Sequence, residues 1–177
     1  MAASPNSAEL AFQHLDRDGD GYVTAQHFEH MARTIIAAFG IDESSPKAIA
    51  LLEGYRRTFE MVFREMDTNR DGRVGPDEFT SAMVALSGKS SASQLRGVCA
   101  AEFAAADRDD DGMITRDEFA HLLSAIGQPS GEVDAAFDAL DRDRDSRISR
   151  AEYVAAWEDY LVSDNPNSVG ARVFAGL

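Results

Sequence analysis

Apolar side chains recur at helical spacing along most of the chain, and the stretches between them are polar and rich in aspartate. Intervals of three and four residues are typical of an amphipathic α-helix that turns one face toward a core. The clearest apolar stripes are Phe28, Met31, Ile35, Ile36 and Phe39; Leu52, Tyr55, Phe59, Val62, Phe63 and Met66; Leu95, Val98, Cys99 and Phe103; Phe119, Leu122, Leu123 and Ile126; and Tyr153, Val154, Trp157 and Leu161. The pattern predicts an all-α fold in which these stripes pack together.

Glycine, serine and proline mark several expected helix ends. Gly40 and Gly127 each follow an apolar stripe, and glycine commonly ends a helix because it adopts a positive φ readily. Ser45 can cap a new helix that starts at Pro46, a position where the missing N–H of proline is no loss. The serine-rich stretch Ser87–Ser93 has the composition of a linker.

Four of the polar stretches repeat one another, at residues 16–21, 67–72, 107–112 and 141–146. Each places side-chain oxygens at alternate positions, reaches a tight turn at the sixth place and has an apolar residue at the eighth. In three of them a Glu stands at the twelfth place. This is the pattern of the EF-hand calcium loop. We number the twelve-residue loops I (16–27), II (67–78), III (107–118) and IV (141–152).

Calcium chemistry explains the spacing. The ion takes six to eight oxygens, which a short loop supplies from places one, three, five, seven and nine and from a bidentate Glu at place twelve. A single Asp-rich run would be read as a solvated turn, because Asp and Gly favour turns. Four such runs in one chain, three of them with the closing Glu, favour metal binding instead.

Loops II, III and IV each supply a set of expected calcium ligands. These are Asp67, Asn69, Asp71, the carbonyl of Arg73 and Glu78 in loop II; Asp107, Asp109, Asp111, the carbonyl of Met113 and Glu118 in loop III; and Asp141, Asp143, Asp145, the carbonyl of Arg147 and Glu152 in loop IV. At place nine, Gly75 leaves room for water, while Thr115 and Ser149 offer hydroxyls. Ser146 takes the place of the turn glycine in loop IV, at about 1 kcal/mol. We therefore expect that site to be weakened and not lost.

Loop I departs from the pattern at its last place. It offers Asp16, Asp18, Asp20, the carbonyl of Tyr22 and Thr24, but place twelve is His27. Imidazole is a poor ligand for calcium and cannot be bidentate. Two interpretations remain open: a loop kept only as the structural partner of loop II, or a weak fourth site for Ca²⁺ or Mg²⁺.

The apolar residue at place eight lets two loops lie side by side as a short antiparallel ladder. We expect Val23 to pair with Val74 and Ile114 with Ile148. This predicts four EF-hands in two pairs: an N-terminal pair at residues 1–86 and a C-terminal pair, with a tail, at residues 94–177. The linker-like stretch falls between the pairs.

Composition narrows the function. The net charge is −14 and the pI is near 4.5, which disfavours nucleic acid and anionic membranes as partners, and much of this charge belongs to the proposed sites. Cys99 is the only cysteine, which excludes an internal disulfide and fits a reducing compartment. No signal-like or membrane-spanning apolar run is present. We expect a cytoplasmic monomer, with calcium ions as its partners and no protein partner indicated.

The loop spacing suggests a particular branch of the EF-hand superfamily. Successive loops start 51, 40 and 34 residues apart, whereas calmodulin-like proteins space their loops almost evenly. With the short linker and the C-terminal tail, the chain resembles the sarcoplasmic calcium-binding protein group, including the calerythrin-like proteins of actinobacteria. That resemblance implies a compact arrangement, one degenerate loop and a calcium-buffering role.

Three functional classes use this kind of chain: a buffer, a sensor and an enzyme or photoprotein. Sensors line an exposed groove with methionine, but the 6 Met are scattered and the 10 Phe dominate, which favours a fixed core. A photoprotein cavity needs several converging Trp, Tyr and His residues, and the chain has one Trp. No nucleophile with a base partner stands out. We predict a calcium buffer that is not an enzyme, with a sensor as the alternative.

The end of the chain is expected to fold back. Asp164, Asn165 and Pro166 favour a turn, and Val169, Val173, Phe174 and Leu177 beyond it are apolar. Such a tail could occupy the groove that a sensor offers to its target.

Overall fold

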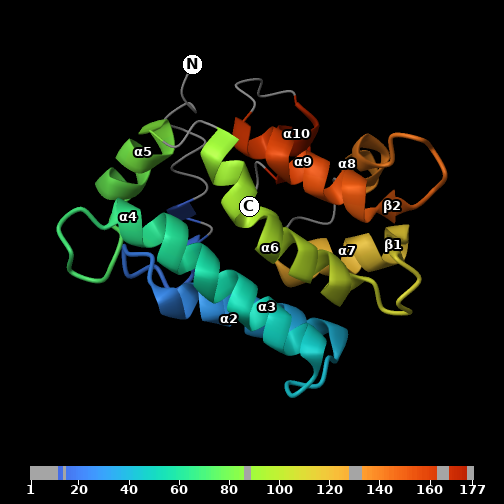
Figure 1. Cartoon of the computed structure of the whole chain (residues 1–177), viewed down its shortest axis with the longest axis horizontal. Coiled ribbons are helices and arrows are strands. Elements are labelled where there is room, and N and C mark those ends of the chain that lie inside the picture. Colours follow the sequence, from blue (N-terminus) through green and yellow to red (C-terminus); the bar gives the residue numbers. More distant parts are fainter. Residues whose placement is uncertain (1–11, 14, 86–88, 128–132, 163–167, 175–177) are drawn as a thin grey trace.

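The structure, a computed structural model, describes residues 12–13, 15–85, 89–127, 133–162 and 168–174, and in these residues it is mainly helical (Figure 1). The main elements are α2 (Ala25–Phe39), α3 (Pro46–Thr58), the π-helical turn η1 (Phe59–Phe63), α4 (Arg64–Met66), α5 (Pro76–Ala85), α6 (Lys89–Ala106), β1 (Met113–Ile114), α7 (Arg116–Ala125), α8 (Val133–Leu140), β2 (Ile148–Ser149), α9 (Arg150–Val162) and α10 (Val169–Phe174). The all-α prediction is confirmed.

The predicted helix boundaries between α2 and α3 are confirmed. Gly40 ends α2 with a φ of 61°, and its N–H bonds the carbonyls of Ile36 and Ala37. Ser45 caps α3 by accepting a hydrogen bond from the Ala48 N–H, and Pro46 is the first helical residue. The connection is therefore short and fixed at both ends.

The helix predicted to run into loop II contains a π-helical turn that its periodicity does not indicate. In this turn Phe59 and Phe63 stack with 6.1 Å between their ring centroids and 4° between their planes. Both rings also contact Phe28 of α2, at 5.6 and 4.5 Å between centroids. Residues four apart lie on one face of a helix, so both aromatic rings reach the same partner.

Helix α6 joins the two halves of the molecule. It crosses the middle of the molecule in Figure 1 and packs against α3 on one side and α9 on the other. Its first residue is Lys89, so the stretch expected to be a linker is helical from that residue on, while residues 87 and 88 lie outside the described part. Gly54 permits the close approach of α3 and α6, because a Cβ there would lie 3.2 Å from the Val98 Cα.

Three side chains cap helix ends across the two halves. Each donates a hydrogen bond to a backbone carbonyl at or just beyond the C-terminal end of a helix of the other half, where carbonyls lack partners and positive charge is favoured. The pairs are Arg17 with Ile126 at 2.7 Å, Lys47 with Asp107 at 2.7 Å, and His121 with Ala38 at 2.8 Å. The halves are therefore fastened by polar contacts as well as by apolar packing.

The C-terminal helix α10 packs against α9 and α8. Val173 is buried, and the Gly170 N–H donates to the Asp159 carboxylate at 2.8 Å. The predicted turn at 163–167, the Phe174 side chain and Leu177 lie outside the described residues. The prediction that the tail folds back onto the molecule is therefore confirmed for the part that contains Val173.

In the described ranges, no helix is both long enough and apolar enough to cross a membrane.

Candidate metal loops

The four loops pair as predicted. Val23 and Val74 exchange both backbone hydrogen bonds at 2.9 Å, and β1 pairs with β2 in an antiparallel register that sets Ile114 opposite Ile148. The four side chains at place eight are fully buried. The loop between α4 and α5 lies at one end of the molecule and the β1–β2 pair at the other (Figure 1).

Loop III is shaped by backbone N–H groups that bind its carboxylates. The two Asp107 oxygens accept hydrogen bonds from the Asp111 and Gly112 N–H groups, at 3.1 and 2.9 Å. Asp111 in turn accepts from the Met113 N–H at 2.8 Å. These bonds curl the chain around its own carboxylate oxygens.

Glu118 closes loop III from the first turn of α7. One carboxylate oxygen accepts from the Thr115 N–H at 2.8 Å in a capping box, and the other accepts from the Arg108 N–H at 3.0 Å. Burial raises the pKa of Glu118, but these hydrogen bonds outweigh burial and hold the pKa below its usual value. The carboxylate therefore stays ionised and aimed into the loop.

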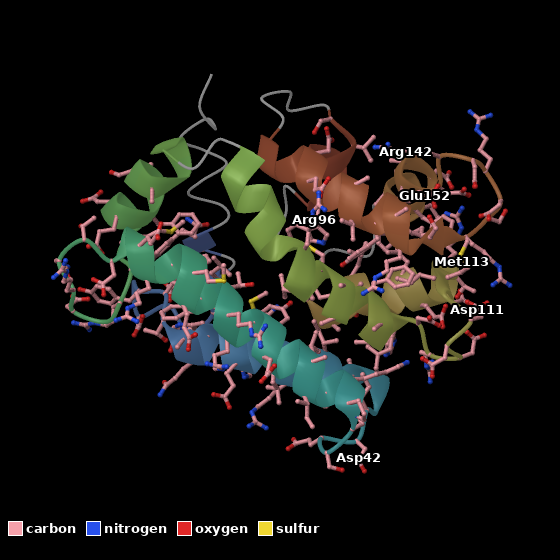
Figure 2. All side chains as sticks on the ribbon, in the orientation of Figure 1. Asp42, Arg96, Asp111, Met113, Arg142 and Glu152 are labelled. Carbon is pink, nitrogen blue, oxygen red and sulfur yellow. The ribbon has the colours of Figure 1, made fainter. Side chains whose placement is uncertain are left out.

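Carboxylates converge in loops III and IV. In each loop, ligand atoms from the first, third and twelfth places lie within 4.8 Å of one another; the residues are Asp107, Asp109 and Glu118, and Asp141, Asp143 and Glu152. Figure 2 shows Asp111, Met113 and Glu152 gathered at the end of the molecule that carries β1 and β2. Three carboxylates this close repel one another unless a cation lies between them, so both loops fit a calcium ion.

Loop IV repeats this geometry despite its serine. Ser146 has a φ of 67°, and its N–H donates to Asp141 at 3.0 Å, as the Gly112 N–H does to Asp107 in loop III. Positive φ also recurs at place four, in Arg70, Asp110 and Arg144. The sequence interpretation missed this second left-handed position, because only loop I has a glycine there.

Loop II has the same kind of hydrogen bonds, but its three acidic side chains are not among the groups of converging ligand atoms found in the described residues. Gly72 N–H donates to Asp67 at 2.9 Å, and Asn69 replaces the aspartate at place three. Glu78 accepts from the Gly75 N–H at 3.0 Å and from the backbone of Thr68 and Asn69 at 3.1 and 3.2 Å. The Gly75 bond is the main reason that the pKa of Glu78 is lowered. The expected ligands of loop II therefore include the amide oxygen of Asn69 where loops III and IV have an aspartate carboxylate.

Loop I is closed by a hydrogen bond of His27. Its Nδ1 accepts from the Thr24 N–H at 3.1 Å, the position that a Glu oxygen holds in the other loops. A backbone N–H can only donate, so the proton of the neutral ring sits on Nε2, which lies 3.3 Å from the Asp18 carboxylate. A protonated nitrogen cannot be a metal ligand. In the tautomer that this bond selects, His27 is not a ligand for a cation, although ligand atoms of Asp16, Asp18 and His27 lie within 4.8 Å of one another and Asp16 keeps one buried oxygen without a partner among the described residues.

The residues at place seven connect the loops of each pair through their side chains. In the C-terminal pair Arg147 forms an ion pair with Asp111 of loop III. This contact, after the Met113 N–H, helps to lower the pKa of Asp111. In the N-terminal pair the Arg73 guanidinium lies over the Tyr22 ring, 4.3 Å from its centroid. The sequence had assigned only the carbonyls of Arg147 and Arg73.

Comparison with known proteins agrees with this geometry. The model of the EF-hand domain pair matches residues 6–84 and 98–158. Calerythrin from Saccharopolyspora erythraea is 28% identical over 135 residues, which cover 74% of this chain and 76% of calerythrin. The structure of a Streptomyces coelicolor calcium-binding protein, described as a basis for prokaryotic calcium-mediated regulation, aligns with a TM-score of 0.81 and 29% identity, covering 89% of this chain and 98% of that one.

A more distant neighbour shares the fold alone. The coelenterazine-binding protein from Renilla muelleri, in its calcium-loaded apo form, aligns with a TM-score of 0.67 at 21% identity, covering 97% of this chain and 94% of that one. The calerythrin-like resemblance and the prediction of four EF-hands in two pairs are both confirmed. Since the family model covers most of the chain and the loops pair as EF-hands do, the chain belongs to the EF-hand family.

Proposed function

We propose that this EF-hand protein binds calcium and acts as a cytoplasmic calcium buffer. The observation that carries the proposal is the convergence of three carboxylates within 4.8 Å in each of loops III and IV. Calcium takes carboxylate and carbonyl oxygens in this kind of loop. The Streptomyces coelicolor relative, which aligns over nearly its whole length, is described as a calcium-binding protein, and this supports the same ligand here.

We assign three calcium sites. Their side-chain ligands are Asp67, Asn69, Asp71 and Glu78; Asp107, Asp109, Asp111 and Glu118; and Asp141, Asp143, Asp145 and Glu152. Arg73, Met113 and Arg147 contribute backbone carbonyls. Loop I supports loop II through the Val23–Val74 bridge without holding an ion. The alternative, a weak fourth Ca²⁺ or Mg²⁺ site, requires His27 to leave its bond with Thr24.

The buffering role rests on the closed packing of the helices. Sensor EF-hands open a groove for a target when calcium binds. Here α10 packs on α9 and α8, and burying a side chain such as Val173 is worth roughly 1.5–3 kcal/mol. The contacts of Arg17, Lys47 and His121 across the halves also resist opening. A sensor remains the second candidate, because the Streptomyces relative is described in terms of calcium-mediated regulation.

We propose no catalytic role for the chain. Its converging acidic residues all belong to the loops in the part of the structure that is described, and Cys99 is buried, with a pKa that burial raises above its usual value. A monomer without nucleic-acid or membrane partners fits the charge of −14.

Calorimetric titration with calcium in excess magnesium, run alongside a dye that fluoresces on apolar surfaces, tests this function. A buffer gives three binding events and little change in dye signal. A large calcium-dependent dye signal in the parent protein would establish the sensor instead. Deleting the residues after Asn165 supplies the contrast, since removal of α10 is expected to raise dye binding in calcium.

A further inference from the structure

A carboxylate is buried in the core of the molecule, away from the metal loops. Glu102 lies in the last third of α6 and is only 5% exposed. Its neighbours in sequence and on the same helix face are apolar core residues, among them Val98, Cys99 and Phe103. An acidic side chain in such a place is costly to keep ionised unless it is paired. Among the described ion pairs, none involves Glu102.

Two tyrosines from different halves of the molecule contact this carboxyl group. The Tyr55 hydroxyl on α3 is 2.5 Å from Oε1, and the Tyr153 hydroxyl on α9 is 3.0 Å from Oε2. Both tyrosines are buried, with 4% and 1% exposure. The contact therefore spans the three helices that join the halves, α3, α6 and α9.

The surroundings favour the neutral carboxyl group. Burial raises the pKa of Glu102 to about 7, although the two tyrosine hydroxyls act in the opposite direction. The charge of Glu102 and the charge of Glu158 on α9 both act on the thiol of Cys99, three residues earlier on α6. From α2 the neighbour of Tyr55 is the Phe28 ring, 6.3 Å away between centroids. Helices α2 and α7 and the turn η1 also pack against α6. In the residues that the structure describes, none of them places a charged group where it changes the pKa of Glu102.

We propose that Glu102, Tyr55 and Tyr153 form a proton-dependent clasp between the two halves. The protonated carboxyl holds α3 against α6 and α9, because hydroxyl groups can both donate and accept while the neutral acid needs no counter-ion. Ionisation places a negative charge without a counter-ion among apolar side chains, and this cost exceeds what the hydrogen bonds donated by the two tyrosines return, so the fold loses stability. None of the three residues is an assigned metal ligand, but Tyr153 directly follows Glu152 of loop IV, so the clasp is tested at saturating calcium.

The direction of the pH effect follows from the raised pKa. A carboxyl whose pKa in the folded state is raised from 4.5 to about 7 stabilises the fold fully below the lower value, and this contribution is lost as the pH rises through the higher one. In saturating calcium, the melting temperature of the parent should therefore fall between about pH 5.5 and about pH 7.5. Fluorescence of Trp157, the single tryptophan, one turn beyond Tyr153 on α9, should change over the same range.

Glu102→Gln tests the clasp, with Glu53→Gln as its control. Glu53 is on α3 and half exposed, so its change removes the same charge without touching the core. The Glu102→Gln protein should lose the fall in melting temperature and the fluorescence change, and the control should keep both. Equal pH dependence in parent and Glu102→Gln would overturn the proposal.

Infrared spectroscopy of the parent measures the protonation state of Glu102 directly, so this test does not depend on a variant that folds. At about pH 6, below the raised pKa, the calcium-loaded parent should show the carbonyl band of a buried protonated carboxylic acid. The band should disappear as the pH passes through the neutral range, and Tyr55→Phe, which removes a donor to the ionised form, should move its midpoint upward. An ionised carboxylate throughout, with no such band, refutes the clasp.

Discussion

Loops I and III share the same pattern of backbone hydrogen bonds but differ in the side chain that closes them. In both, the N–H at place nine bonds the side chain at place twelve, and the N–H at place six bonds the first aspartate. In loop III the side chain at place twelve is Glu118, whose oxygens accept only. In loop I it is His27, whose second nitrogen turns an N–H toward Asp18. The comparison teaches that the same backbone loop can be closed by an acceptor or by a donor, so the fold of the loop does not by itself fix its ligand chemistry.

The largest expected effect comes from neutralising the closing carboxylate of loop III. Glu118→Gln replaces a charged bidentate ligand by a neutral monodentate one, so calcium affinity at loop III should fall by about one to several powers of ten. Calorimetry would measure the stoichiometry and the affinities. Asp117→Asn, an exposed neighbour outside the ligand set, should leave them nearly unchanged. Parent-like binding by Glu118→Gln would show that loop III is not a calcium site.

The reverse exchange should restore loop I. His27→Glu removes the N–H that faces Asp18 and supplies two oxygens, while the other side chains are already in place. We expect one additional calcium ion in the titration. His30→Glu, on the exposed side of the same helix, adds the same charge and should add no site. If the parent already binds four calcium ions with similar affinity, loop I was wrongly interpreted.

A smaller effect is expected from the turn at place six. Ser146→Gly relieves the strain of a side chain at a φ of 67°, worth about 1 kcal/mol, so calcium binding at loop IV should tighten by about fivefold. Gly112→Ser, at a φ of 82°, should weaken loop III by a similar factor. Calcium titration of both variants checks whether the residue at place six is the main cause of the difference in affinity between loops III and IV. A change in the same direction for both would contradict the strain argument.

The smallest effect should come from Arg147. Its ion pair with Asp111 is partly exposed, and such pairs contribute about 0–1 kcal/mol. Arg147→Gln should raise the calcium affinity of loop III a few-fold by restoring negative charge to a ligand, and the gain should shrink at high salt. Arg144→Gln, in loop IV like Arg147, is the control because it removes the same charge. If the control gained more calcium affinity than Arg147→Gln, the effect would come from the overall charge of the protein and not from the ion pair with Asp111.

Local features could be predicted from the sequence because they depend on neighbouring residues. Gly40, Ser45 and Pro46 set their helix boundaries through their own backbone preferences. The loops and the pairing of their apolar residues follow from a spacing that repeats within the chain. The assignment of individual ligands stays a prediction.

Features that depend on distant residues could not be predicted. The π-helical turn is not indicated by the apolar periodicity, and its rings Phe59 and Phe63 both contact Phe28 from another helix. The serines before Arg96 read as a linker because their composition suits one, whereas the helix that contains them is held by packing against α3 and α9. Glu102 interrupts an apolar stripe, and only the fold shows that two tyrosines meet it.

The contact between Arg17 and the Ile126 carbonyl has a consequence for biosynthesis. The two residues are 109 positions apart, and a ribosome releases the chain from its N-terminus. The first EF-hand pair therefore leaves the exit tunnel well before α7 can accept the arginine, and long-range contacts of this kind form slowly. Until then the faces of α2 and α3 that later meet α7 and α6 are exposed. Newly made chains should depend on chaperones most strongly while α6 and α7 are still being synthesised.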